Sequence, residues 1–492
     1  MPEPPAIVWF RHDLRVEDNP ALVAAAARGG NIVPVFIWAP QDEDWPEGGA
    51  SRCWLHRSLA SLQEDLGRLK SRLVIRRGSA ADELGRLVRE TGATSVFWNR
   101  RYEPKIGARD ARIEAELKKN GVTAECDNAS LLFEPWTVKT AAGTPFRVFT
   151  PFWRNCLELG EPDEPQPAPA KLPAPKKWPA SLALGELKLE PRIPWDAGIR
   201  RAWSPGAAEA ARELERFLTG GLEDYATERD RPDHLGTSRL SPFLHFGEIG
   251  PRQVWHAVRR AARERRPRKH KEIAEPFLRQ LVWREFAHHL LYHHPHTVTE
   301  PLREKFATFP WLEDPPGLRA WQRGATGYPY IDAGMRQLWT TGWMHNRVRM
   351  AVASFLVKDL LIPWQEGARW FWDTLVDADL ADNTLGWQWT AGCGADASPF
   401  FRVFNPVGQG ERFDPEGSYV RHWVPELAKL PREWIHKPWE APPTVLKATG
   451  VELGATYPRP IVDHAAARKR ALDALRTITG KRGRRGSGEV TE

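Results

Sequence analysis

The segment DADLADNTLGWQW (residues 377–389) carries an unusual mixture of side chains. Three carboxylates, one asparagine and two tryptophans lie close together here, just after a stretch as apolar as residues 350–357. Asp377 and Asp379 can point at one polar ligand from a bend in the backbone, while Trp387 and Trp389 add large, rigid aromatic surface. Solubility does not require this combination. The segment therefore predicts one wall of a cofactor site.

The composition is that of a folded globular protein with two or three domains. The chain has 492 residues, of which 41% are hydrophobic and 27% are charged, so it can bury a large core. It contains 24 tryptophans but only 7 tyrosines. Core packing and a functional use of indole rings both remain open for these tryptophans.

The charge balance and the cysteines indicate the partner and the compartment. A net charge of +7 favours a polyanionic partner, with nucleic acid first. The four cysteines lie far apart without a CxxC pair, which argues against a disulfide framework and against a thiolate metal site. The amino terminus lacks a signal-peptide pattern, and no segment has the length of a membrane span. We expect a cytoplasmic protein.

The amino-terminal part alternates short apolar runs with helical patterns. Buried strands are predicted at residues 7–10, 32–38, 73–77 and 95–99, and helices at 20–27, 54–70, 81–90 and 106–119. This alternation predicts an α/β fold with a doubly wound, Rossmann-like parallel sheet. Ligands of such sheets bind at the carboxyl ends of the strands, where Arg11 to Arg15 follow the first strand. A GxGxxG fingerprint is missing from the chain.

A proline-rich stretch separates this part from a helical one. Residues 161–195 are dense in proline and should run extended over the surface. Helical patterns then follow at residues 207–218, 251–266, 275–294, 329–342, 345–361 and 364–379. We predict an α/β domain at residues 1–135, a connector at 136–204, an all-helical domain at 205–475 and a basic disordered tail at 476–492.

Several long motifs together resemble the DNA photolyase and cryptochrome family. They are VWFRHDLR (residues 8–15), GTSRLSPFLHFGEI (236–249), WREF (283–286), GYPYIDAGMRQLWTTGWMHNRVRM (327–350) and the segment 377–389. The resemblance covers about residues 7–475. It implies an amino-terminal antenna domain, a helical FAD-binding domain, and a deoxyribodipyrimidine photo-lyase that repairs cyclobutane pyrimidine dimers by light-driven electron transfer from reduced FAD.

The resemblance also implies which residues hold FAD. By themselves, residues 236–241 could wrap a diphosphate, but such a string is more often an N-cap and turn. Asp377 and Asp379 correspond to acids near the isoalloxazine and ribose, with Arg349 beside them. The full set of implied FAD contacts is Tyr225, Thr237, Ser238, Arg239, Leu240, Ser241, Phe277, Arg349, Asp377, Ala378, Asp379 and Asn383.

Asn383 distinguishes repair from signalling within the family. On residue type alone, this asparagine would more often cap the turn before Thr384. A side-chain amide near flavin N5 can accept from a protonated nitrogen or donate to a bare one, so it permits several redox states. The family's repair enzymes have asparagine at this position, whereas signalling cryptochromes commonly have aspartate or cysteine. Asn383 therefore favours repair over a cryptochrome photoreceptor.

The remaining implied residues carry electrons or contact the lesion. Trp387, Trp364 and Trp311 match the family's electron-transfer chain, with Trp370 and Trp372 as a possible branch. The implied DNA and lesion contacts are Arg229, Gln280, Trp283, Asn346, Arg347, Met350 and Trp389. Histidines occupy the positions of Asn346 and Met350 in the (6-4) branch, so their absence favours cyclobutane dimers. Gln280 replaces a glutamate of well-known dimer enzymes and matches the (6-4) branch.

The partners and further cofactors complete the prediction. UV-damaged DNA is the expected partner, and the basic run at residues 258–271 could contact phosphates or be a solvated helix end. A second chromophore, methenyltetrahydrofolate or deazaflavin, is expected, although Pro104 to Ile106 replace a known folate-binding Asn-Glu pattern. His289 and His293 lie one turn apart, but no further ligand completes a set, so no metal is expected. We expect a monomer associated with the nucleoid through DNA. A flavin-containing DNA-binding module without catalysis is the remaining alternative.

Overall fold

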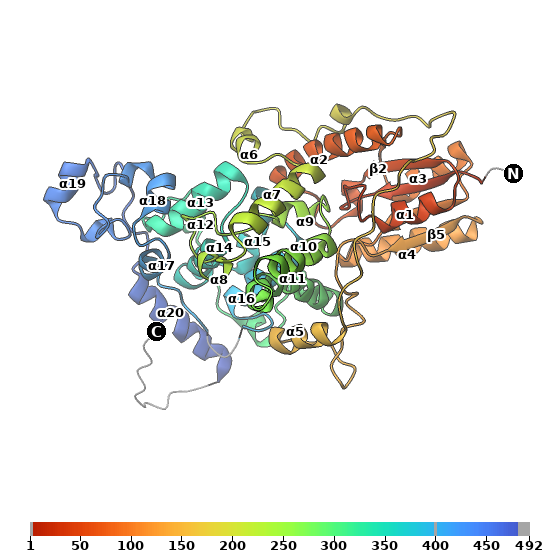
Figure 1. Ribbon diagram of the computed structural model, residues 1–492. Coiled ribbons are helices and arrows are strands. Elements are labelled where there is room, and N and C mark those ends of the chain that lie inside the picture. Colours follow the sequence, from red (N-terminus) through yellow and green to blue (C-terminus); the bar gives the residue numbers. More distant parts are fainter. Residues whose placement is uncertain (1–2, 398–400, 481–492) are drawn as a thin grey trace. The chain divides into compact units, whose positions relative to one another are not determined.

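The structure is a computed structural model that describes residues 3–397 and 401–480 (Figure 1). Its chain divides into two compact units. The first unit contains the residues up to Pro295, Leu338–Trp343 and Phe371–Asn383. The second unit contains His296–Gln337, Met344–Trp370 and the residues from Thr384 onward. Both units therefore include part of the predicted helical region.

A five-stranded parallel sheet forms the amino-terminal part of the first unit. The strands are β1 (Ala6–Phe10), β2 (Ile32–Trp38), β3 (Val74–Arg77), β4 (Ser95–Asn99) and β5 (Thr123–Asp127), in the order β3-β2-β1-β4-β5. All four predicted strands and the parallel sheet are confirmed. Strand β5 was not predicted, because it lies at the sheet edge beyond β4 and lacks a continuous apolar run.

Helices alternate with these strands, as the doubly wound pattern requires. They are α1 (Pro20–Ala27), α2 (Gly49–Arg68), α3 (Ala80–Thr91) and α4 (Pro104–Lys119). Leu84 and Leu87 of α3 join Ile113 of α4 in one core with the side chains of Trp9 and Trp98. The apolar residues of α3 and α4 repeat at three- and four-residue spacing, so each helix presents one buried stripe to the sheet.

The predicted connector contains helices on either side of its proline-rich stretch. Helix α5 (Phe149–Glu158) precedes this stretch and α6 (Ala197–Ala202) follows it. Residues 161–195 form only one short 3-10 turn at Leu184–Leu187, which confirms the extended course. The stretch is held by backbone hydrogen bonds, including Asp18 N–H to Gln166 O at 2.7 Å and Ile32 N–H to Pro173 O at 2.8 Å.

The rest of the described chain is helical. Its elements are α7 (Ala207–Gly220), α8 (Tyr225–Glu228), α9 (Ser241–His245), α10 (Pro251–Arg265), α11 (His270–His293), α12 (Pro315–Gln322), α13 (Pro329–Thr341), α14 (Asn346–Ser354), α15 (Trp364–Thr374), α16 (Leu380–Ala391), α17 (Pro406–Phe413), α18 (Ser418–Trp423), α19 (Pro443–Thr449) and α20 (His464–Thr479). Across the described ranges, none of the helices combines the length and the apolar composition that a bilayer crossing requires.

Several helix boundaries differ from the predictions, and α2 and α11 each begin five residues before the predicted start. The helix predicted to reach Asp379 ends at Thr374, which leaves the acids in an irregular bend. The helix predicted to reach residue 361 ends at Ser354 and continues as a π-helical turn, Phe355–Asp359. Helix α20 extends to Thr479, so residues 476–479 are helical and not part of a disordered tail. The tail beyond Gly480 lies outside the described residues.

Two helical glycines provide a test of the packing in the first unit. A Cβ at Gly198 in α6 would lie 2.1 Å from the carbonyl oxygen of Thr340, whereas a Cβ at Gly107 in α4 would meet no atom within 4 Å. We expect G198A to reduce the free energy of unfolding by about 1–3 kcal/mol, because the backbone must shift. The matched variant G107A should be neutral or more stable by up to about 1 kcal/mol, since alanine favours a helix. Denaturant unfolding measures both, and equal effects would contradict the packing.

Candidate functional site

The predicted site residues fall into two groups. The first unit holds Tyr225, Arg229, Thr237 to Ser241, Phe277, Gln280, Trp283 and Asp377 to Asn383. The second unit holds Trp311, Asn346, Arg347, Arg349, Met350, Trp364, Trp387 and Trp389.

Asp379 is the polar centre of the first group. Its Oδ1 accepts a hydrogen bond from the Asp382 backbone N–H at 2.9 Å, so it caps the amino end of α16. Its Oδ2 lies 3.5 Å from Nε2 of His288 and 3.9 Å from Nδ1 of His245. An aspartate just before a helix is the usual local signal for such a cap. The two histidines were not identified from the sequence, because they lie about 90 and 130 positions earlier in the chain.

The hydrogen bonds around His288 define its charge. Nδ1 of His288 donates to the Arg284 carbonyl oxygen at 3.0 Å, so Nε2 needs a second proton to donate toward Asp379. Burial alone would lower the pKa of His288, but the neighbouring Asp379 carboxylate outweighs it and raises the pKa above the usual value. Burial alone would raise the pKa of Asp379, but the charge of His288 dominates and holds it well below the usual range. The two side chains form an ion pair.

Asp382 has a different environment from Asp379, although it is only three residues away. The Asp382 side chain is accessible to solvent, but many protein atoms of the first unit lie around its carboxyl group. The lost hydration raises the pKa of Asp382 to about 6, and the negative charge of Asp379 adds to this shift.

Asn383 lies inside α16 and does not cap a turn. Its backbone N–H donates to the Asp379 carbonyl oxygen at 2.9 Å, an ordinary helical hydrogen bond. The interpretation of Asn383 as a turn cap is therefore wrong, because Asp379 occupies the capping position four residues earlier.

Tyr225, Phe277 and Arg229 lie close together in the first unit. The rings of Tyr225 and Phe277 are buried, with centroids 5.3 Å apart, and Phe217 lies 4.6 Å from Phe277. The guanidinium of Arg229 lies 5.7 Å from the centre of the Tyr225 ring. Helices α7, α8 and α11 therefore bring these side chains together as an apolar wall with a cationic edge.

The loop from Thr237 to Ser241 is tightly bent. Arg239 has a left-handed backbone with φ of 56°, and its guanidinium stacks 4.1 Å above the Trp203 ring. Arg216 donates to the Thr237 carbonyl oxygen at 3.1 Å, and Ser241 Oγ accepts from the Trp343 indole at 3.2 Å. These bonds and the strained residue fix the loop, which is consistent with a turn and does not by itself identify a ligand.

Trp283 is held by a residue that the sequence did not reveal. The Phe149 ring of α5 stacks on it with 3.8 Å between centroids and 7° between planes. Gln280 lies one helical turn earlier on α11, at the spacing that places both side chains on the same face. The aromatic run around Phe149 was the available signal, but it fell within the predicted connector.

The tryptophans of the second unit have ordered neighbours. The Trp387 ring packs 6.1 Å from Trp321, and a Cβ at Gly367 would lie only 2.0 Å from Trp387, so glycine is required there. Trp364 is buried, and the Trp311 ring lies 4.4 Å from Phe309. Electron transfer through Trp311, Trp364 and Trp387 stays a prediction.

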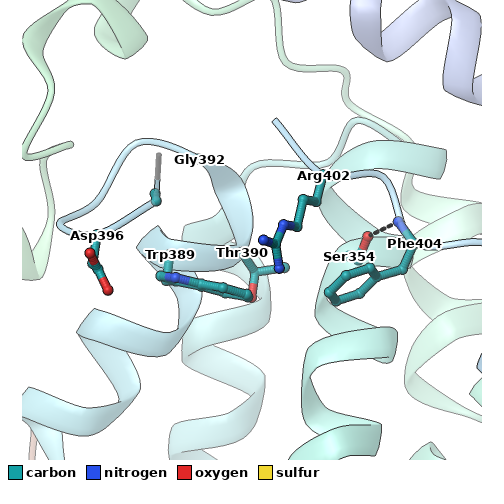
Figure 2. Close-up of a pocket in the computed structure, with 8 residues that line it drawn as sticks. Ser354, Trp389, Thr390, Gly392, Asp396, Arg402 and Phe404 are labelled. Carbon is teal, nitrogen blue, oxygen red and sulfur yellow. Dashed lines mark hydrogen bonds between the residues drawn. The ribbon is translucent and has the colours of Figure 1, made fainter. Parts of the chain in front are cut away.

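Trp389 lines a small hollow of about 50 Å³ in the second unit (Figure 2). The other lining residues are Ser354, Thr390, Gly392, Asp396, Ala397, Arg402 and Phe404. The hollow combines one large aromatic surface with one guanidinium. Arg402 was not predicted, because it follows the helical motif and belongs to no recognised pattern.

The buried amine of Lys358 binds the backbone next to Thr390 and Gly392, two residues that line this hollow. Its Nζ donates to the carbonyl oxygen of Ala391, the last residue of α16, at 2.8 Å and lies 2.9 Å from the centre of the Phe401 ring. Burial holds the pKa of Lys358 well below its usual range. Lys358 thus fixes the end of the helix that carries Trp387 and Trp389.

Helix α14 carries the other predicted lesion residues. Asn346 is exposed, and Met350 lies one turn further on, at the spacing that puts both on one face. The Arg347 guanidinium covers the Phe413 ring at 4.5 Å, and Arg349 donates to the Met344 carbonyl oxygen at 2.7 Å.

His289 and His293 on α11 both form hydrogen bonds with backbone groups. Nε2 of His289 accepts from the Phe146 N–H at 3.0 Å, and its Nδ1 lies 3.1 Å from the Pro135 carbonyl oxygen. Nε2 of His293 lies 3.1 Å from the same oxygen. Both nitrogens of His289 are therefore occupied, which argues against a metal at this pair.

Sequence comparison places these features in a known family. A profile described as DNA photolyase matches residues 6–174, and one described as the FAD binding domain of DNA photolyase matches residues 277–477. The chain is 50% identical over 475 residues to a deoxyribodipyrimidine photo-lyase of Agrobacterium fabrum, covering 96% of this chain and 98% of that one. The chain belongs to the DNA photolyase family.

Two further similarities describe the range of this photolyase family. The chain is 44% identical to Cryptochrome-2 of Arabidopsis thaliana, over 95% of this chain and 78% of that protein. A bacterial class III photolyase from Agrobacterium tumefaciens, solved by crystallography, superposes with a TM-score of 0.93 at 48% identity, covering 98% and 99% of the two chains. The predicted family and fold class are confirmed.

The residues of the first unit fit the FAD of a photolyase. Tyr225 and Phe277 supply buried aromatic surface, and the ionised Asp379 supplies a charged acceptor. Aromatic rings beside a charged hydrogen-bond acceptor suit a ligand that has both an aromatic ring system and polar hydrogen-bond donors.

The Asp379 and His288 pair can be tested without a flavin. D379N should keep the cap of α16, because asparagine also caps helices, but should lower the pKa of His288, since burial and the charge of Arg284 both oppose its protonation once the Asp379 charge is removed. D379A should also lose the cap, at about 1 kcal/mol. NMR titration of labelled histidine measures the pKa, and thermal unfolding measures the cap.

The sign of the pH dependence follows from the raised pKa of His288. Its ion pair stabilises the fold fully below the unfolded-state pKa, and that stabilisation is lost as the pH rises through the folded-state pKa. The wild-type melting temperature should therefore fall across this window more steeply than that of D379N. An unchanged His288 pKa in D379N would contradict the ion pair.

Proposed function

We propose that the chain is a deoxyribodipyrimidine photo-lyase that uses light and FAD to repair cyclobutane pyrimidine dimers in DNA. The observation that carries this proposal is the nearly full-length, 50% identical match to a protein of that name. Residues 1–135 would carry the antenna function, and residues 205–475 the FAD- and DNA-binding function.

The residues that would hold FAD are those implied by the family motifs. They are Tyr225, Thr237, Ser238, Arg239, Leu240, Ser241, Phe277, Arg349, Asp377, Ala378, Asp379 and Asn383. Reduced FAD, when bound, supplies the light-excited electron donor. The chain itself would place and orient the cofactor, exclude water, and keep the Asp379 charge fixed through His288. Asn383 would offer an amide that both donates and accepts.

The dimer would leave the duplex and stack on tryptophans, as photolyases do with flipped bases. Trp283 and Trp389 are the proposed stacking residues, each worth about 1–3 kcal/mol per base. One face of Trp283 is already covered by Phe149, so its ring is rigid before substrate arrives. Gln280, Asn346, Arg347 and Met350 would line the lesion, and Arg229 would contact the DNA backbone. Trp311, Trp364 and Trp387 would carry electrons to the flavin.

Two finer features belong to this proposal. A second chromophore, folate or deazaflavin, would act as antenna in the α/β part of the first unit. The protein would be a monomer and meet its substrate in the nucleoid. The 44% identity to Cryptochrome-2 supports one alternative, a blue-light photoreceptor, which the asparagine at position 383 disfavours.

Repair of a defined lesion tests the function. The purified protein is photoreduced, mixed with a thymine-dimer oligonucleotide and illuminated, and restored thymine is followed by absorbance. We expect recovery in light and none in a matched dark sample. Recovery only with a (6-4) lesion would overturn the substrate assignment. Failure with both lesions, with flavin photoreduction intact, would favour the photoreceptor.

The basic run at residues 258–271, from the second half of α10 to the start of α11, offers a test of DNA contact. Arg263, Arg268 and Lys269 are exposed and form no ion pair among the described residues, whereas Arg259 pairs with Glu161 at 2.6 Å. Each phosphate contact adds about 0.9 to the slope of log affinity against log salt. We expect R263A to reduce this slope by nearly one unit, and the matched variant R259A to change it less. Fluorescence anisotropy with duplex DNA measures both, and equal slopes for R263A and wild type would remove Arg263 from the interface.

A further inference from the structure

A cluster of three metal-ligand side chains lies in the first unit, and none of the three is among the residues implied for FAD and DNA. His12 follows β1, Glu47 precedes α2 by two residues, and His245 is the last residue of α9. One ligand atom from each of the three lies within 4.8 Å of the other two. Their side chains are 12%, 5% and 4% exposed. Three segments that are distant in sequence thus bring two imidazoles and a carboxylate to one buried point.

The cluster has more lone pairs than the protein satisfies. Glu47 Oε1 lies 2.8 Å from Nε2 of His12, but Glu47 Oε2 has no hydrogen-bond partner in the described part of the chain. Both ring nitrogens of His245 also lack a partner within hydrogen-bond distance among the described residues. Buried polar atoms are nearly always satisfied, so these atoms indicate an occupant that is not part of the chain.

The backbone around the cluster is fixed independently of any occupant. The Leu14 N–H donates to the Phe246 carbonyl oxygen at 3.1 Å, and Arg15 Nη1 donates to the Gly247 carbonyl oxygen at 2.9 Å. A Cβ at Gly247 would lie 2.2 Å from the His12 carbonyl oxygen, so only glycine permits this approach. The loop after β1 and the end of α9 therefore hold His12 and His245 together, with ring centroids 4.8 Å apart.

The surroundings suit a cation. Asp379 Oδ2 lies 3.9 Å from Nδ1 of His245, the kind of outer carboxylate that orients metal-binding histidines. The nearby positive charge of Arg101 is paired with Glu43 at 3.1 Å and with Glu103 at 2.6 Å. Acidic groups therefore outnumber basic ones around the cluster.

We propose that His12, Glu47 and His245 bind one divalent transition-metal ion, with Zn²⁺ as the best match. Two imidazoles and one carboxylate are the donors that zinc and related ions take from proteins, whereas Ca²⁺ and Mg²⁺ prefer oxygen ligands. Three protein ligands leave a fourth position for water. The ion would join the loop after β1, the start of α2 and the end of α9. The sequence predicted no metal because the three ligands share no local motif.

Metal binding by the purified full-length protein tests this proposal. The protein is treated with a chelator, desalted and titrated with Zn²⁺ by calorimetry, and bound zinc is measured by elemental analysis. We expect one Zn²⁺ per wild-type chain, and at least a tenfold weaker affinity in H245A and in E47Q, which keeps the shape of Glu47 but removes its charge. Replacement of Zn²⁺ by Co²⁺ should give a visible absorption band that both variants lose.

The matched control is H56A. His56 lies 3.5 Å from Glu190 in the same unit, so it is also a histidine beside a carboxylate, but no third ligand joins it. H56A should keep the full zinc affinity. Thermal unfolding and flavin content of all variants show that the fold is retained, and E47Q serves if H245A does not fold. Substoichiometric zinc in the wild type, or unchanged affinity in E47Q, would overturn the proposal and leave a buried water as the occupant. Dimer repair by the same wild-type preparation is a separate readout.

Discussion

The site depends on how the two ends of helix α16 are held. At its amino end, Asp379 accepts the Asp382 N–H and pairs with His288, so one carboxylate serves as both helix cap and counter-ion. At its carboxyl end, the Lys358 amine donates to the Ala391 carbonyl oxygen. The Asp379 charge complements the positive end of the helix dipole, and the Lys358 amine satisfies a carbonyl group at the other end. Asn383, Trp387 and Trp389 lie between these two anchors, so their positions follow from them.

Burial and neighbouring charges together set the ionisation of the two aspartates at the start of α16. Asp379 and Asp382 are three residues apart, yet His288 keeps the first ionised while lost hydration raises the pKa of the second to about 6. Two like charges this close could not both be stabilised without such a partner. A fixed negative charge beside a neutralisable one lets the start of α16 face a ligand with both donors and acceptors.

Several of the 24 tryptophans have a structural role, so core packing accounts for part of the high tryptophan content. The indoles of Trp203, Trp321 and Trp372 donate to backbone carbonyl oxygens, and those of Trp54 and Trp255 donate to carboxylates. Trp54, Trp203 and Trp321 are buried, so these bonds also satisfy indole N–H groups that would otherwise lack a partner in the interior. Trp283 and Trp389 differ, because one stacks flat on Phe149 and the other lines an open hollow.

Features with a local period or a contiguous motif could be predicted from the amino-acid sequence alone. Apolar runs predicted four of the five strands, helical spacing predicted the main helices, and the motifs around residues 236–249 and 327–389 predicted the family. Only the tertiary structure decided which partners these residues have: His288 and His245 beside Asp379, Phe149 beneath Trp283, Lys358 at the end of α16, and Glu47 beside His12. The reason is physical. Strand and helix periods arise from neighbours a few residues apart, whereas a buried charge or ring is satisfied by whatever the fold brings next to it, at a separation in sequence that no local pattern records.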